Sequence, residues 1–377
     1  QPARAWVQRQ PLGVVGVISP WNYPIQLALA PVATALAAGN RVMLKPSELA
    51  PHVAAQLAHL VPQFFAPDEL CVVQGDATVA SAFAALPFDH LFFTGSTRVG
   101  RQVAQAAAAN LTPTTLELGG KSPCILDAGC DLEDAARKIA HGKLLNAGQT
   151  CIAPDYLLLP QGREAAFAAA FRRAVERLYP TIAGNPDYCA VIDVQHTARL
   201  QGLLQEARQS GARIDTIDPQ PEAGAASATP RQMPPALVFG TMDAMRLMQE
   251  EIFGPVLPVL TYARLDDAVA YINARPRPLA LYWFGQSSAT RDEVLRRTVS
   301  GGVTVNDTLM HIAHPGLPFG GVGESGWGSY HGEAGFLRMS VQKAVFVQSR
   351  WSASTWLQPP YGPRFDGLVR VLRRVLG

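Results

Sequence analysis

The sequence predicts an α/β protein with two domains. In the first 127 residues, short apolar runs alternate with helical patterns, which is typical of a parallel sheet covered by helices. After TTLELGG the alternation starts again with the apolar run PCILD, which indicates a second α/β domain that begins near Gly119. A length of 377 residues is enough for two such domains and for a sizeable core.

The first domain is expected to be a parallel sheet with its helices between the strands. The expected strands are residues 13–18, 41–45, 71–75, 89–94 and 114–117, and the expected helices are 24–39, 51–65 and the alanine-rich segment after the glycine turn at 95. A sheet of this kind favours a nucleotide cleft at the carboxyl ends of its strands.

The second domain opens with the strand PCILD and a helix that Asp131 caps, running toward Asn146 and leading into the loop of Cys151. Further strands are expected at 256–262, 279–285 and 301–307. Two more strand patterns, residues 4–10 and 340–347, lie outside both sheets. They could pair with each other or with another subunit.

Composition excludes several classes of protein and of site. A net charge of +2 without a basic block argues against a nucleic-acid surface, and no apolar run is long enough to span a bilayer. Five cysteines without CxxC spacing argue against a disulfide framework and a zinc site, so no metal is expected and a reducing cytoplasm is the simplest compartment. The basic amphipathic pattern 367–377 is expected to be a surface helix, with a membrane or partner contact as the alternative.

Cys151 is the cysteine with the most distinctive surroundings, because it ends the sequence GQTC directly after a predicted helix. A nucleophilic cysteine acts as a thiolate and needs a neighbour that lowers its pKa or accepts its proton. Considered alone, Cys151 is better explained as a small buried core residue than as a nucleophile.

Two polar residues at strand ends are candidates to assist it. Glu117 ends a strand before two glycines, where partial burial would raise the pKa of its carboxyl and make it a general base; a structural cap is the alternative. Asn22, in SPWNYP, ends another strand and offers an amide donor for an oxyanion, although it could equally cap the next helix.

Two further turns are suited to a nucleotide. FTGSTRVG is a strand, a glycine turn and a helix start that offers N–H groups to a pyrophosphate, although it lacks the middle glycine of GxGxxG. MLKPSE ends a strand with Lys45 and Glu48, which suit ribose hydroxyls and a phosphate, or else form a charged surface turn. Arg98 opposes the dipole at its helix start, so it either reaches a phosphate or points into water.

Together these stretches resemble the aldehyde dehydrogenase superfamily from about Gln10 to Val347. The motifs that carry the resemblance are PWNYP, KPSE, FTGST, ELGGKSP, GQTC, EEIFGP and LPFGGVGESG, in the family's order. The endings RPRPLALYWFG, SGGVTVNDTLMH and GSYHGEAGF are most similar to the class 3 and coniferyl aldehyde dehydrogenase branch.

The resemblance implies a Rossmann-type cofactor domain, a second α/β catalytic domain and a small oligomerisation element of strands. It divides the chain into an oligomerisation strand (1–10), cofactor domain (11–118), catalytic domain (119–320), return segment with strand (321–350) and tail (351–377). Family members carry a further amino-terminal segment of the cofactor domain, so this segment is expected to be missing here. A homodimer is expected.

The resemblance also assigns roles to residues. The catalytic residues would be Cys151, Glu117 and Asn22. The residues that bind NAD or NADP would be Trp21, Lys45, Ser47, Glu48, Gly95, Ser96, Gly100, Leu118, Gly119, Glu251 and Phe253. The residues that line the substrate tunnel would be Tyr23, Ile152 and Phe319, which suit an apolar or aryl aldehyde.

The implied reaction is the NAD(P)-dependent oxidation of an aldehyde to a carboxylic acid through a thiohemiacetal and a thioester on Cys151. Glu48 would favour NAD, but the branch includes members that accept both cofactors. Three alternatives are weighed: an acylating enzyme that passes the thioester to coenzyme A, a catalytically silent nucleotide-binding relative, and a cysteine hydrolase. Glu117 disfavours the first, and the intact set of Cys151, Glu117 and Asn22 disfavours the second. The third usually needs a histidine base in a recognisable motif, which is absent.

Overall fold

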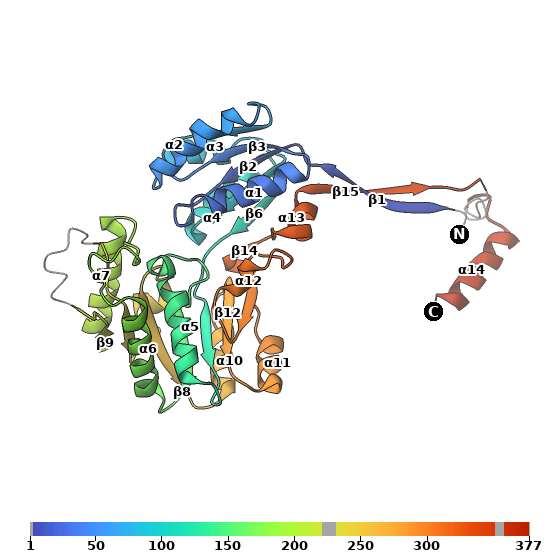
Figure 1. Cartoon of the computed structure of the whole chain (residues 1–377). Helices are drawn as coiled ribbons and strands as arrows, with labels where there is room; N and C mark the ends of the chain where they lie inside the picture. The colour runs from blue at the N-terminus through green and yellow to red at the C-terminus, as the bar shows by residue number, and fades with distance from the viewer. Residues whose placement is uncertain (1–2, 221–230, 351–357, 377) are drawn as a thin grey trace.

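A computed structural model describes residues 3–220, 231–350 and 358–376. Two domains, each a sheet with helices on its faces, lie one above the other, and a long two-stranded arm extends from the upper domain (Figure 1). The upper domain comes mostly from the first part of the chain, and the lower domain from the middle part. The two-domain α/β architecture predicted from the sequence is confirmed.

The upper domain has a six-stranded sheet with strand order β14-β6-β5-β2-β3-β4. Its strands are β2 (Val14–Ile18), β3 (Arg41–Lys45), β4 (Leu70–Val72), β5 (His90–Thr94), β6 (Thr114–Glu117) and β14 (Gly326–Trp327). Its helices are α1 (Gln26–Ala37), α2 (Pro51–Leu60), α3 (Ala77–Ala84) and α4 (Thr97–Ala108). Strands β2 to β6 are parallel, and β14 pairs antiparallel with β6.

Alternating residues of the upper strands bury opposite faces, as the period of two requires. Val15, Val17 and Leu44 join one core with residues of α1 and α2. Leu91 and Phe93 join another with residues of α3 and α4. Because both faces are covered, the strands read as continuous apolar runs, and this made them visible in the sequence.

The lower domain has a seven-stranded sheet with strand order β13-β12-β7-β8-β11-β10-β9. Its strands are β7 (Pro123–Leu126), β8 (Tyr156–Pro160), β9 (Arg213–Thr216), β10 (Ala236–Phe239), β11 (Val256–Tyr262), β12 (Ala280–Phe284) and β13 (Gly302–Val305). Its helices are α5 (Leu132–Leu144), α6 (Glu164–Leu178), α7 (Val194–Gln209), α9 (Arg246–Gln249), α10 (Leu265–Asn273), α11 (Ser288–Arg297) and α12 (Met310–Ala313). Asp131 caps α5 as expected, since its side chain accepts from the N–H groups of Glu133 and Asp134.

The chain crosses from the upper to the lower sheet between Glu117 and Pro123, and β14 returns it to the upper sheet. A helix, α13 (Gly332–Arg338), then packs against α1 and leads into the arm. In the arm β1 (Arg4–Pro11) pairs antiparallel with β15 (Ser340–Val347), so the two end strands pair with each other. Within the expected end segments, residues 1–2, 351–357 and 377 lie outside the described residues.

Three strands of the lower sheet were missed by the sequence analysis. β8 begins only five residues after Cys151, so the sequence does not separate its apolar run, Tyr156–Pro160, from the Cys151 loop. β9 is a short edge strand with exposed and half-buried residues. β10 lies next to a segment rich in proline and alanine, of which residues 221–230 are outside the described part. In addition, β4 ends at Val72, earlier than expected.

No helix among the described residues has the length and apolar character needed to cross a membrane.

Candidate functional site

A cleft of about 1400 Å³ lies between the two domains, with walls from both. The upper wall comes from segments that directly follow β2, β3 and β5, which are parallel and therefore end at one edge of the sheet. This is the position where open α/β sheets bind ligands. The lower wall includes Cys151 and the loop around Glu251.

The Cys151 loop has an unusual backbone that places the thiol in the cleft. After α5, Asn146 and Ala147 adopt left-handed conformations with φ values of 52° and 54°, and Gly148 follows at 77°. A Cβ on Gly148 would stand 2.3 Å from the carbonyl oxygen of Gly254, so only glycine fits there. Strain of this kind persists where the surrounding structure holds it in place, and it is common at active sites.

Gln149 holds this loop in position. Its side chain is buried, donates to the carbonyl oxygens of Asn146 (2.9 Å) and Ala190 (3.1 Å), and accepts from the N–H of Ile192 at 2.8 Å. All three bonds join the loop to itself or to the chain beyond it. The glutamine of the GQTC motif is therefore structural, and it fixes the position of Cys151.

Cys151 is half-buried, and its surroundings favour the protonated thiol. Burial, followed by the carboxyls of Glu251 and Glu117, raises its pKa to about 12, although N–H groups of Cys151 and Ile152 bonded to the sulfur act in the opposite direction. A thiol with such a pKa is a weak nucleophile until a base accepts its proton. The site therefore needs a base close by.

Glu117 is the candidate for that base. It ends β6, its side chain is only 3% exposed, and among the described residues neither carboxylate oxygen has a hydrogen-bond partner. Burial raises the pKa of its carboxyl well above the ordinary value. An unpaired, buried carboxyl beside a thiol, with both groups on one cleft, is the arrangement that general acid–base chemistry requires.

Asn22 reaches the cysteine loop from the other wall. Its Nδ2 donates to the carbonyl oxygen of Gln149 at 3.1 Å, and its own carbonyl oxygen accepts from Nδ2 of Asn146 at 2.9 Å. The next residue, Tyr23, shares a 2.6 Å hydrogen bond with Oγ1 of Thr150, directly before the cysteine. Burial, followed by a weaker influence of the Cys151 sulfur, raises the pKa of the Tyr23 phenol. The amide of Asn22 is thus held against the loop that carries Cys151.

The far end of the cleft contains the nucleotide-binding candidates of β3. Lys45 is 1% exposed, donates from Nζ to the carbonyl oxygen of Pro46 at 2.8 Å, and lies 3.6 Å from a carboxylate oxygen of Glu48. Ser47 accepts from the N–H of Leu49 at 3.2 Å. Lys45, Ser47 and Glu48 all line the cleft. A buried ammonium beside a half-exposed carboxylate suits the phosphate and hydroxyl groups of a nucleotide.

Gly95 and Ser96 form the cleft wall after β5. Ser96 caps α4 by accepting from the N–H of Val99 at 3.4 Å, and a Cβ on Gly95 would stand 2.5 Å from the Phe93 ring. The amino end of α4 therefore faces the cleft with free backbone donors, as a pyrophosphate site requires. Arg98 also lines the cleft, which supports the phosphate interpretation of this residue over the solvent one.

Glu251 is packed against the glycine turn after Glu117. A Cβ on Gly119 would stand 1.9 Å from Oε2 of Glu251, so the absence of a side chain at Gly119 provides the space for this carboxyl. Burial and then Asp155 raise the pKa of Glu251 to about 8, against a hydrogen bond from the N–H of Gly120 and the opposing lysines. Nearby, the Trp21 ring packs edge-on against the rings of Phe253 and His196. The distance between ring centroids is 5.4 Å in both pairs.

Five of the expected site residues are not among the described residues that line this cleft. They are Tyr23, Gly100, Leu118, Ile152 and Phe319. Gly100 and Leu118 pack against each other, since a Cβ on Gly100 would stand 2.5 Å from a Leu118 methyl group. Their expected direct contact with the cofactor is thus replaced by a packing role that joins α4 to the sheet.

The substrate-lining residues lie on the other side of the cysteine. Ile152 is 1% exposed and belongs to the core. Phe319 is also buried, stacked on His311 at 5.9 Å and edge-on to Tyr330 at 5.8 Å. The pKa of Tyr330 is raised by burial, then by Glu117 and Cys151. Phe319 therefore lies one ring behind Tyr330 and is not itself on the cleft wall.

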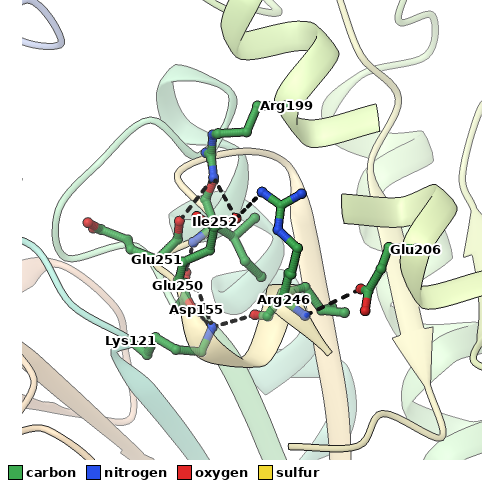
Figure 2. Close-up of polar contacts among 9 residues, drawn as sticks. Lys121, Asp155, Arg199, Glu206, Arg246, Glu250, Glu251 and Ile252 are labelled. Carbon is green, nitrogen blue, oxygen red and sulfur yellow. Dashed lines mark hydrogen bonds and ion pairs between the residues drawn. The ribbon is translucent and has the colours of Figure 1, made fainter. Parts of the chain in front are cut away.

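A network behind Glu251 was not found from the sequence (Figure 2). Lys121 forms an ion pair with Asp155, donates to the carbonyl oxygen of Leu247 at 2.7 Å, and donates to that of Glu250 at 3.1 Å. Asp155 also accepts from the N–H of Ile252 at 2.9 Å. The signals were present in ELGGKSP and APDY, but neither motif shows that its charged residue reaches the loop of Glu251.

Arg199 completes the network from α7. Its guanidinium donates to the carbonyl oxygens of Glu251 and Ile252, and it lies 3.8 Å from the carboxylate of Glu250 (Figure 2). Glu250 also pairs with Arg246 at 3.1 Å. The loop that carries Glu251 is therefore fixed on both sides.

Comparisons with known proteins agree with this geometry. The model of the aldehyde dehydrogenase family matches residues 1–345. The chain is 51% identical over 369 residues to a probable coniferyl aldehyde dehydrogenase of Pseudomonas aeruginosa, covering 98% of this chain and 76% of that relative. It is 41% identical over 345 residues to the dimeric NADP-preferring aldehyde dehydrogenase of Rattus norvegicus, covering 91% and 74%. The solved structure of the substrate-bound state of Staphylococcus aureus AldH has a TM-score of 0.91 and 39% identity, covering 98% of this chain and 79% of that one.

Proposed function

The chain belongs to the aldehyde dehydrogenase family and oxidises aldehydes with NAD or NADP, and on this premise we propose that Cys151 is its nucleophile and Glu117 its general base. The observation that carries the proposal is the presence of Cys151, Glu117 and Asn22 on one cleft. The raised pKa of Cys151 means that its thiol needs a base, and the unpaired, buried carboxyl of Glu117 supports that role.

The reaction begins when Glu117 accepts the thiol proton and the sulfur attacks the aldehyde carbon. A C–S bond forms, the carbonyl π bond opens, and the Nδ2 of Asn22 together with the N–H of Cys151 stabilises the oxyanion. NAD(P) held by the cleft residues would supply the acceptor for the hydride that leaves this carbon. Glu117 first releases the thiol proton to solvent and then deprotonates the water that attacks the remaining thioester. The C–S bond breaks, and the departing thiolate takes a proton back, giving the carboxylic acid and the free thiol.

The residues of the cleft fit the cofactor. We assign the adenosine ribose to Lys45, Ser47 and Glu48, the pyrophosphate to the turn of Gly95 and Ser96, and the nicotinamide ribose to Glu251. Trp21 and Phe253 pack beside it, and Gly119 provides the space that Glu251 needs. With these assignments, the segment before Gly119 is the cofactor domain. The segment from Gly119 to residue 320 is the catalytic domain.

The substrate class proposed for the chain is an apolar or aryl aldehyde such as coniferyl aldehyde. The support is that Tyr23 and Tyr330 both lie within electrostatic reach of Cys151, with Phe319 packed behind Tyr330, and that a 51% identical relative is named a probable coniferyl aldehyde dehydrogenase. An assay of the full-length protein against aliphatic and aryl aldehydes with each cofactor, followed at the absorbance band of the reduced nicotinamide, tests this. A clear preference for short polar aldehydes would contradict the substrate proposal.

We also propose a homodimer in the cytoplasm. Every residue of β1 is exposed, and the arm presents the large apolar side chains of Trp6, Val7, Phe346 and Val347, which are suited to burial against a second copy. The five cysteines are all free, as expected in a reducing compartment. Sedimentation at increasing protein concentrations tests the dimer, and a monomer throughout would contradict it.

A further inference from the structure

The last helix, α14 (Pro363–Val375), does not belong to either domain. It lies beyond the free end of the arm, away from both sheets (Figure 1). None of its residues is buried. A helix of this length is marginal in water by itself, so its apolar side chains need a surface to cover them.

The side chains of α14 are segregated with the helical period. Apolar residues recur at intervals of three and four and therefore share one face. They are Phe365, Leu368, Val369, Leu372, Val375 and Leu376. Asp366, Arg370, Arg373 and Arg374 fall on the opposite face, while Arg364 lies at the amino end of the apolar face. Val375 and Leu376 are 75% and 80% exposed and Leu372 is 39% exposed, while Phe365, Leu368 and Val369 are half-buried, so the carboxyl-terminal part of the apolar face is open to solvent.

The positive charge of the chain is concentrated in this one helix. With four arginines and one aspartate, Pro363–Val375 carries +3, whereas the whole chain carries +2. The rest of the chain is therefore slightly negative. A long apolar face bordered by arginine, on a helix that is not hydrophobic all round, is the pattern of helices that lie in the headgroup region of a membrane.

We propose that α14 binds an anionic lipid surface, with its apolar face inserted at the boundary of the acyl chains and its arginines at the lipid phosphates. A nucleic acid would use the arginines but leave the apolar face uncovered. A second copy of this chain would cover the apolar face, but the remainder of each chain has a net charge of only about −1, so it offers the arginines little net attraction. The anionic lipid surface matches both faces of the helix.

The test uses the full-length protein with vesicles of phosphatidylcholine alone and of phosphatidylcholine mixed with phosphatidylserine. The protein should float with the mixed vesicles, release at high salt, and bind phosphatidylcholine alone much more weakly. Since each arginine near such a surface contributes about fivefold in affinity, the variant R370Q/R373Q/R374Q should bind roughly a hundredfold more weakly. L368S/L372S should also lose binding, through the apolar face.

The control variant R177Q/R208Q/R296Q removes the same charge from exposed positions on α6, α7 and α11 and should bind like the unchanged protein. All variants should keep their dehydrogenase activity, which shows that they are folded. Equal binding to both kinds of vesicle, or equal losses in the control and in the α14 variants, would overturn the proposal. The proposal would also be overturned if the unchanged protein bound no vesicles and the dimer dissociated in L368S/L372S. In that case the apolar face of α14 would pack against a second copy of the chain.

Discussion

The side-chain amide of Asn22 donates to the carbonyl oxygen of Gln149, at a distance of 3.1 Å between donor and acceptor. Asn22 follows the first strand of the upper sheet, and Gln149 belongs to the loop of the cysteine. This hydrogen bond spans the two domains, so the donor of one domain and the nucleophile of the other keep a fixed relationship. Asn22 is the proposed oxyanion donor, and this bond fixes its position relative to the Cys151 loop before substrate arrives.

Asn22→Ala should lower kcat by about 10²- to 10³-fold, because it removes one of the two donors to the oxyanion. Cofactor binding should change little, since the nucleotide end of the cleft is untouched. Steady-state kinetics measures the first effect, and cofactor titration the second. The matched control is Asn110→Ala, which removes an exposed amide that donates to Ala85. A kcat equal to that of this control would remove Asn22 from the mechanism.

Glu117→Gln keeps the shape of the side chain but cannot accept a proton. We expect kcat to fall by about 10²- to 10⁴-fold, because both the thiol and the hydrolytic water lose their base. Rapid mixing with aldehyde and NAD(P) measures the first turnover separately from the steady state. If both remain normal in Glu117→Gln, the base is another group.

Glu251 should make the stability of the cofactor-free protein depend on pH. Its pKa rises from the ordinary 4.5 to about 8, mainly through burial. Between these values the folded chain holds a proton that the unfolded chain releases, so the free energy of unfolding falls as pH rises through this window. Glu251→Gln should reduce the fall, as measured by urea unfolding at several pH values.

The control for this experiment is Glu176→Gln, at an exposed position of α6. It should leave the pH dependence unchanged. Glu117, whose pKa burial also raises, acts in the same direction. Buried His90 and His311, with pKa values lowered to about 3 and 4, act in the opposite direction. The test is therefore the difference between Glu251→Gln and the unchanged protein. A steeper fall in Glu251→Gln than in the unchanged protein would contradict the assignment.

Lys121→Met should destabilise the protein and weaken cofactor binding. The carboxylate of Asp155 is 4% exposed and would lose its ion-pair partner, at a cost of about 3 kcal/mol. The loop of Glu251 would also lose the donor to the carbonyl oxygens of Leu247 and Glu250. Urea unfolding and the KM for the cofactor measure the two effects.

The comparison for Lys121 is Arg297→Met, which breaks surface ion pairs with Asp266 and Glu293. Such pairs contribute about 0–1 kcal/mol each, so this variant should stay close to the unchanged protein in stability and in KM. Equal effects of the two substitutions would show that the buried network does not fix the loop.

Much of the fold could be predicted from the sequence because both faces of each sheet are covered. Strands such as β2 and β5 then appear as unbroken apolar runs, and Asp131 marks the start of α5 by the chemistry of its cap. The edge strand β9 gave no such signal, since its residues are exposed or half-buried. β9 is a strand because it pairs with β10, which lies about twenty residues further along the chain, and a local sequence pattern does not encode that pairing.

Asn22, Lys45, Gly95 and Glu117 could be singled out because they lie at or just after strand ends, and parallel strands end together. The roles of Cys151, Glu251 and Phe253 came from the family resemblance. What could not be predicted was which residues face the cleft. Gly100 is adjacent in sequence to cleft residues, yet it faces the core and accommodates Leu118. Lys121 and Asp155 meet across two strands and a loop, and no local pattern encodes that contact.

The most direct test of the account is the reaction of Cys151→Ala with aldehyde and NAD(P), followed at the absorbance band of the reduced nicotinamide. The account predicts no reduced cofactor, even in a single turnover, while the cofactor still binds in the cleft, which quenching of Trp21 fluorescence would report. Cys71→Ala, which changes a half-buried cysteine of β4 outside the cleft, should keep full activity. Reduced cofactor from Cys151→Ala at the rate of the unchanged protein would contradict the assignment of Cys151 as the nucleophile.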